Sequence, residues 1–290
     1  MTLTGLYVPL ITPFDDNDKV ALDALEKLAV DTLTAGAAGL VALGTTAEPS
    51  SLSEAERRTV LDVVAGVCHA QNAQLIVGAN TPDALAKLTD RTAAALTLVP
   101  PFVRPGERGV VAYFEHLAAV SPVPLVAYHV PYRTGQSLSA ATIRRLAAIR
   151  AVVGIKYAAG GIDEDTVDLM AEQPADFAVL GGDDPFIAPL LALGATGGIL
   201  ASALVAPAEF AALLDAYREG DLGTARPLGH KLAKLSRALF AAPNPTVIKA
   251  VLHACGTIPT PAVRLPLVQP EASIVRTARE LADPRSSGLR

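Results

Sequence analysis

Eight short apolar runs alternate with longer amphipathic stretches over residues 1–219, and this alternation predicts an α/β fold of the (β/α)8 TIM-barrel type. The length of this stretch is close to the usual size of such a barrel. Further amphipathic stretches predict a C-terminal helical appendage over residues 220–290. Because no Pro/Gly/Ser-rich or charged linker separates the two parts, we expect the appendage to extend the same domain. A doubly wound parallel sheet is the alternative fold.

The predicted strands are short runs of aliphatic residues bounded by turn residues. In chain order they cover residues 5–12, 39–43, 74–79, 96–99, 124–128, 152–156, 177–181 and 197–201. Each pair of consecutive runs is separated by enough chain for one helical crossover, as parallel neighbours require.

The predicted helices follow from apolar residues three and four positions apart and from capping residues. Leu22, Leu25 and Leu28 begin the first stripe, Ser53 to Glu56 has capping-box spacing, and Thr81 precedes a proline at a helix start. In chain order the helices are expected at 22–33, 53–69, from 81, 110–118, from 139, and at 163–173, 184–193 and 207–219, with 222–239, 245–255 and 271–281 in the appendage.

Composition excludes several classes of protein. Apolar residues make up 51% of the chain and charged residues 18%, which indicates a large buried core. The net charge is −5 and no basic block occurs, so we expect no nucleic-acid partner. Only Cys68 and Cys255 are present, too few for a disulfide framework, which favours the cytoplasm.

No membrane span, metal or cofactor is expected. The start of the chain lacks the basic residues of a secretory signal, and prolines and glycines divide the long uncharged stretch at 185–208. The histidines show no ligand spacing, and no glycine-rich nucleotide-binding motif occurs. The expected partners are therefore small-molecule substrates.

Lys156 stands apart among the seven lysines because it alone ends a predicted strand. Active sites of these barrels lie at the C-terminal ends of the strands. The apolar run before Lys156 should desolvate its amine, which lowers the pKa and makes the amine a nucleophile toward carbonyls. A lysine paired with a carboxylate at the barrel mouth is the alternative, and the spacing alone does not decide between them.

Other strand ends carry the groups that imine chemistry needs, namely donors for a substrate carboxylate and a group that moves protons. The second strand is followed by Thr45 and Thr46 among small residues; a simple turn before a helix is the alternative there. The fifth strand ends at Tyr128, and Arg133 follows in the next loop. Arg133 could bind a carboxylate bidentately, or it could be a surface residue that caps a helix.

Several motifs cover nearly the whole chain: LYVPLITPF, GLVALGTTAEPSSLSEAER, YHVPYRTG, VVGIK, GGDD, APNPTVIK and RLPL. Together they resemble the dihydrodipicolinate synthase and N-acetylneuraminate lyase superfamily, whose barrels act on pyruvate or another 2-oxo acid through a lysine Schiff base. The Pro-Asn-Pro segment at 243–245 followed by Lys249, with Arg264-Leu265-Pro266, resembles the synthases more than the sialic acid lyases.

Carried over by position, the resemblance implies three catalytic residues. Lys156 would form the imine, Tyr128 would relay protons, and Thr45 would be the hydroxyl partner of Tyr128. An iminium withdraws electrons from the methyl carbon of pyruvate, so this relay could remove a proton and form an enamine that attacks an aldehyde.

The resemblance also implies substrate-binding residues and an assembly. Thr46 would hold the carboxylate of pyruvate, the carbonyl of Ile199 would line the pyruvate pocket, and Arg133 would bind the carboxylate of the second substrate. The family further implies a homotetramer or at least a homodimer. One departure affects the chemistry, because Phe102 stands where the synthases carry a tyrosine that completes the proton relay from the neighbouring subunit.

Three hypotheses about function follow. The first is the dihydrodipicolinate synthase reaction, which condenses pyruvate with aspartate semialdehyde. The second is a paralogous aldolase or dehydratase for a 2-oxo-3-deoxy acid or a 4-hydroxy-2-oxo acid, whose substrate tolerates Phe102. The third is a non-catalytic barrel.

Overall fold

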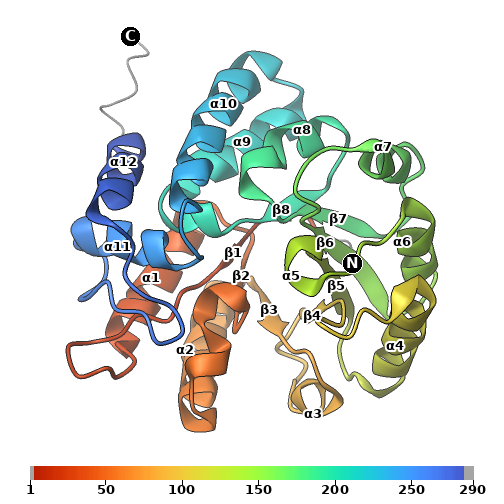
Figure 1. Ribbon diagram of the computed structural model, residues 1–290, viewed down its shortest axis with the longest axis horizontal. Coiled ribbons are helices and arrows are strands. Elements are labelled where there is room, and N and C mark those ends of the chain that lie inside the picture. The colour runs from red at the N-terminus through yellow and green to blue at the C-terminus, as the bar shows by residue number, and fades with distance from the viewer. Residues whose placement is uncertain (1–2, 284–290) are drawn as a thin grey trace.

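The computed structural model describes residues 3–283 and contains a closed barrel of eight parallel strands in chain order (Figure 1). The predicted (β/α)8 barrel is therefore confirmed. The strands are β1 Gly5–Pro9, β2 Gly39–Ala42, β3 Gln74–Gly78, β4 Ala94–Leu98, β5 Leu125–His129, β6 Val152–Tyr157, β7 Ala178–Gly181 and β8 Gly197–Ile199.

Helices surround the strands as the amphipathic stretches predict. They are α1 Leu22–Thr34, α2 Glu54–Ala70, α3 Pro82–Leu85, α4 Gly106–Val120, α6 Ala140–Ala147, α7 Glu164–Ala171, α8 Ile187–Ala192 and α9 Pro207–Glu219. The short helix α5 Pro131–Thr134 lies in the loop after β5, and four 3₁₀ turns follow β2, β7 and β8: η1 Thr45–Ala47, η2 Pro49–Ser51, η3 Asp184–Phe186 and η4 Ala201–Leu204. The predicted capping box of α2 is present, with Ser53 accepting from the Glu56 amide.

Some boundaries differ from the predicted ones for local reasons. β1 ends at Pro9 rather than at residue 12, although the Leu10 amide still donates to the Val41 carbonyl. β4 begins at Ala94 rather than at residue 96. The sequence did not indicate this earlier start, because Ala94 and Ala95, although fully buried, are too small to give a strong apolar signal. The third helix is a single turn, since the chain turns back at residues 89–92 to reach this earlier strand.

Side chains of alternate strand residues fill the interior of the barrel, as the two-residue period of a strand requires. This inner cluster contains Tyr7, Val41, Ile76, Ala94, Leu96, Val126, Tyr128, Ala178, Leu180 and Ile199. Glycine is needed where β8 closes the ring against β1: a Cβ at Gly197 would lie 2.2 Å from the carbonyl oxygen of Gly5. The remaining core lies between the strands and the outer helices.

The appendage consists of α10 Leu222–Leu239, α11 Thr246–Ala254 and α12 Ala272–Ala282. Helix α10 packs on α9 and on η3, and α12 packs on α10 and α11 (Figure 1). The segment between α10 and α11 thereby reaches the barrel mouth. The division into a barrel at 1–219 and an extension at 220–290 of one domain stays a prediction. Within residues 3–283, no helix is both long enough and apolar enough to cross a membrane.

Candidate active site

The register of β5 and β6 places Tyr128 directly opposite Lys156 near the C-terminal ends of both strands. The Nζ atom of Lys156 lies 4.4 Å from the centre of the Tyr128 ring. Both side chains are buried. The two groups to which the family resemblance assigns imine formation and proton transfer are therefore neighbours across one strand pair.

A cavity of about 270 Å³, here called the lysine cavity, opens around Lys156. Five predicted site residues line it: Thr45, Thr46, Tyr128, Arg133 and Lys156. The sixth, Ile199, is the last residue of β8 and is fully buried in the same inner cluster as Tyr128, but it is not among the lining residues.

Burial governs the ionisation of the two central groups. Desolvation lowers the pKa of Lys156 to about 8; the nearby positive charge of Arg133 acts in the same direction, and the negative charge of Asp184 opposes it. Burial raises the pKa of Tyr128 to about 12. At neutral pH, Lys156 therefore has an accessible free-amine form, while Tyr128 keeps its proton.

The turn after β7 forms one wall of the lysine cavity. Asp184 is buried, and its Oδ2 accepts from the Ser202 amide at 2.6 Å; desolvation raises its pKa to about 6. Asp183 accepts from the Gly160 amide, and burial raises its pKa as well. A Cβ at Gly182 would lie 2.7 Å from Cγ of Lys156, so a side chain there would displace the lysine. The GGDD motif marked this turn in the sequence without indicating a role for its carboxylates.

The turn after β2 presents the paired threonines to the cavity through η1. Thr46 Oγ1 accepts a hydrogen bond of 3.0 Å from Nδ2 of Asn244, a contact that sequence reasoning missed. Thr45 and Tyr128 line the same cavity, but no hydrogen bond joins their hydroxyls in the part of the chain that the structure describes. The pairing of Thr45 with Tyr128 stays a prediction.

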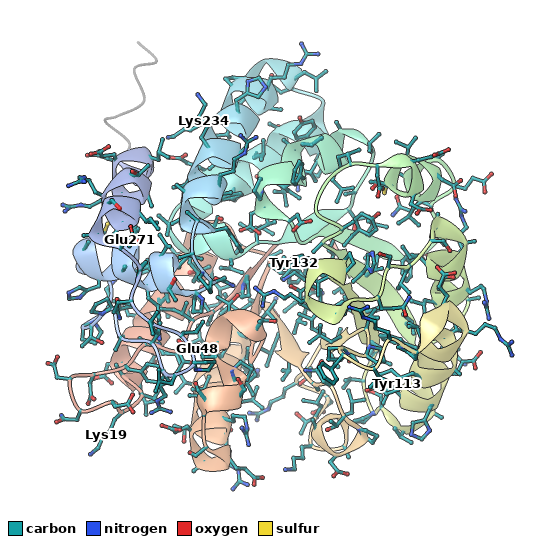
Figure 2. All side chains as sticks on the ribbon, in the orientation of Figure 1. Lys19, Glu48, Tyr113, Tyr132, Lys234 and Glu271 are labelled. Atoms are coloured by element: carbon teal, nitrogen blue, oxygen red, sulfur yellow. The ribbon has the colours of Figure 1, made fainter. Side chains whose placement is uncertain are left out.

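Arg133 extends over the mouth of the cavity from α5. Its Nε donates to the hydroxyl of the neighbouring Tyr132 at 3.0 Å, and its guanidinium carbon lies 5.4 Å from the centre of that ring. Figure 2 shows Tyr132 near the centre of the barrel mouth. Within residues 3–283, no hydrogen bond or ion pair is seen at the terminal nitrogens of Arg133.

A second cavity of about 300 Å³, here called the adjacent cavity, shares several walls with the lysine cavity. The shared residues are Thr45, Tyr128, Arg133 and Asn244. Phe102 lines neither cavity of its own chain, because its side chain is 96% exposed. Among residues 3–283, no three His, Cys, Asp or Glu side chains are grouped so that they could hold a metal ion.

The buried Lys156 lies beside the phenol of Tyr128, in a cavity that also carries hydroxyls and an arginine. Such an arrangement at the C-terminal ends of barrel strands fits a Schiff-base-forming lyase. The sequence matches the model of the Dihydrodipicolinate synthetase family over residues 2–282. The chain belongs to this family. The resemblance and the enzyme class inferred from the sequence are thus confirmed, and the hypothesis of a non-catalytic barrel is set aside.

Individual relatives agree with this assignment. The chain is 34% identical to 4-hydroxy-tetrahydrodipicolinate synthase 2 of Clostridium acetobutylicum, over 92% of this chain and 95% of that protein. It is 36% identical to the 4-hydroxy-tetrahydrodipicolinate synthase of Methanothrix thermoacetophila, over 91% and 90%. The dihydrodipicolinate synthase of Acinetobacter baumannii, solved in complex with pyruvate, superposes with a TM-score of 0.89 at 32% identity, over 97% and 99% of the two chains.

Proposed function

We propose that this protein is a 4-hydroxy-tetrahydrodipicolinate synthase that condenses pyruvate with aspartate semialdehyde. The observation that carries the proposal is the opposed pair Lys156 and Tyr128 within one cavity, with the pKa of the lysine lowered to about 8. The names of the relatives support the choice of substrates.

The proposed reaction begins when the free amine of Lys156 attacks the carbonyl carbon of pyruvate to give a carbinolamine. The carbinolamine takes up a proton on its hydroxyl and loses water, which gives an iminium. The methyl carbon then loses a proton to the relay: the Tyr128 and Thr45 hydroxyls take it up as they release their own proton toward solvent, and an enamine results. The enamine carbon attacks the aldehyde carbon of the second substrate, the iminium forms again, and the new alkoxide takes up a proton. The amino group of the second substrate then attacks the iminium carbon and displaces the amine of Lys156, which closes the ring and frees the lysine. Thr46 binds the pyruvate carboxylate, the Ile199 carbonyl lines its pocket, and Arg133 binds the carboxylate of the second substrate.

Reductive trapping tests the first step. Incubation with pyruvate and borohydride, followed by peptide mass mapping, should place the adduct on Lys156. Lys156→Arg should abolish trapping, whereas Lys27→Arg, a change at an exposed lysine paired with Asp31, should leave it unchanged. An adduct on another lysine of the wild type, or none with any 2-oxo acid, would refute the mechanism.

One observation favours a second candidate, a paralogous aldolase or dehydratase acting on a 2-oxo-3-deoxy acid or a 4-hydroxy-2-oxo acid. Phe102 has no hydroxyl, so it cannot complete a proton relay in a partner subunit. Turnover of aspartate semialdehyde and of a 2-oxo-3-deoxy acid by the same preparation separates the two candidates. Faster turnover of the 2-oxo-3-deoxy acid would favour the paralogue.

We also propose that the protein is a homotetramer or at least a homodimer located in the cytoplasm. Phe102 and Val103 are 96% and 75% exposed in one loop, and burying such apolar side chains against a second copy would be favourable. Both cysteines are free, which suits a reducing compartment. Light scattering at micromolar concentration tests the assembly, and a monomer would contradict it.

A further inference from the structure

A single hydrogen bond joins the C-terminal appendage to the paired threonines. Asn244 lies between α10 and α11, and its Nδ2 donates to Oγ1 of Thr46 at 3.0 Å across 198 positions of sequence. Thr46 is only 3% exposed, and both residues line the lysine cavity. This contact therefore lies where a small substrate would bind next to Lys156.

A buried ion pair holds both partners of this hydrogen bond in place. Lys249, in the first turns of α11, contacts Glu48 at 2.6 Å, and both side chains are almost completely buried, at 0% and 2% exposed. The second oxygen of Glu48 accepts from the Arg264 amide at 2.9 Å. Glu48 follows Thr46 by two positions and Lys249 follows Asn244 by five, so the pair fixes the turn after β2 against the start of α11.

The direction of the hydrogen bond determines what Thr46 can offer to a ligand. A threonine hydroxyl has one proton to donate and two lone pairs that accept. When the amide of Asn244 donates to one lone pair, the hydroxyl proton must point elsewhere, and the lysine cavity is the open side. A carboxylate has only acceptors, so it needs this proton.

We propose that Asn244 is a positioning residue that keeps Thr46 as a hydrogen-bond donor toward the carboxylate of pyruvate. The inference rests on the proposed function, because it assumes that Thr46 binds this carboxylate. If the amide were turned the other way, its Oδ1 would face Thr46 and accept the hydroxyl proton. A lone pair of the Thr46 oxygen would then face the carboxylate of pyruvate. The two orientations differ in what Asn244→Asp would do: with Nδ2 facing Thr46 the change replaces a donor by an acceptor and weakens pyruvate binding, whereas with Oδ1 facing Thr46 it would keep an acceptor and leave binding nearly unchanged.

Three variants test the inference through pyruvate affinity, measured by calorimetry and by the pyruvate dependence of trapping. Asn244→Ala should raise the Kd for pyruvate about tenfold, as loss of an orienting hydrogen bond to a charged contact implies. Asn244→Asp, which has the same size but accepts the Thr46 proton, should raise it further, because an acceptor of Thr46 then faces the carboxylate of pyruvate. In a Thr46→Val background, Asn244→Ala should have no further effect.

A matched control separates this effect from added charge at the barrel mouth. Asn80 lines the adjacent cavity and its Oδ1 accepts from the Leu98 amide, so Asn80→Asp adds the same charge without losing its contact. We expect it to change the pyruvate Kd by less than about threefold. Circular dichroism and thermal unfolding verify that each variant is folded, and if Asn244→Ala does not fold, the isosteric Asn244→Asp carries the comparison.

Trapping on Lys156 with an unchanged pyruvate Kd in Asn244→Ala or Asn244→Asp would refute the inference and leave the proposed function intact. An equal effect of Asn244→Ala with and without Thr46 would also refute it. If the wild type traps no 2-oxo acid at all, the proposed function fails first, and the inference fails with it.

Discussion

Imine formation on Lys156 should depend on pH in a way that an exposed lysine could not reproduce. Burial lowers its pKa from 10.5 to about 8. At pH 7 the free-amine fraction is then about 9%, against about 0.03% for the ordinary value, an increase of about 300-fold in the reactive form. The rate of pyruvate trapping should therefore rise with pH and level off above about pH 8.

Two substitutions should move this profile in opposite directions. Asp184→Asn removes the negative charge that raises the Lys156 pKa, so the rise should shift to lower pH. Arg133→Gln removes a positive charge that lowers it, so the rise should shift to higher pH. Because trapping uses pyruvate alone, the proposed role of Arg133 toward the second substrate does not interfere.

The assay is the initial rate of inactivation by pyruvate and cyanoborohydride between about pH 6 and pH 10, with the Lys156 peptide quantified by mass spectrometry. Lys27→Arg serves as the control, since it keeps an exposed charge and should leave the profile unchanged. A midpoint near 10.5 in the wild type, or shifts of the same sign in both variants, would refute the role of burial and of the two neighbouring charges.

Three further outcomes are expected. If the synthase reaction is the natural one, Phe102→Tyr should raise kcat with aspartate semialdehyde at least about tenfold, or about 1.4 kcal/mol of barrier, by restoring a relay hydroxyl. Lys249→Met should lower the free energy of unfolding in urea by about 3–5 kcal/mol because it leaves the buried carboxylate of Glu48 without its cationic partner, and the added change Glu48→Gln should recover much of this loss. Burial lowers the pKa of His129 to about 4, so between about pH 6.5 and 4 the unfolded state binds a proton that the folded state does not. The contribution of His129 to the free energy of unfolding should therefore fall by about 3 kcal/mol as the pH drops through that window. His129→Asn should remove this loss.

Each of these outcomes has a clear contrary result. Fast synthase turnover by the wild type, without gain in Phe102→Tyr, would show that the missing hydroxyl does not limit the reaction. Wild-type stability in Lys249→Met would mean that the ion pair is not desolvated as its burial indicates. A flat stability profile between about pH 6.5 and 4, relative to His129→Asn, would show that His129 takes up its proton in the folded state.

The sequence by itself determined the barrel and the position of Lys156 at the C-terminal end of a strand. Strand periodicity and helix caps are local properties, and they remain visible in one dimension because each element must bury one face wherever it packs. The placement of Lys156 followed from the same pattern, since a charged residue at the end of an aliphatic strand must lie at the barrel mouth. The start of β4 was not predicted correctly, because the sequence does not show whether an alanine is buried.

Only the tertiary structure decided which distant residues complete the site. In the sequence Lys249 is one of several lysines in the C-terminal helices, yet it is fully buried against Glu48. The contact of Asn244 with Thr46 spans 198 positions and exists only because the segment between α10 and α11 reaches the lysine cavity. Local patterns report which face of an element is buried, but they carry no information about which other element covers it, and that choice is made by the packing of the whole chain.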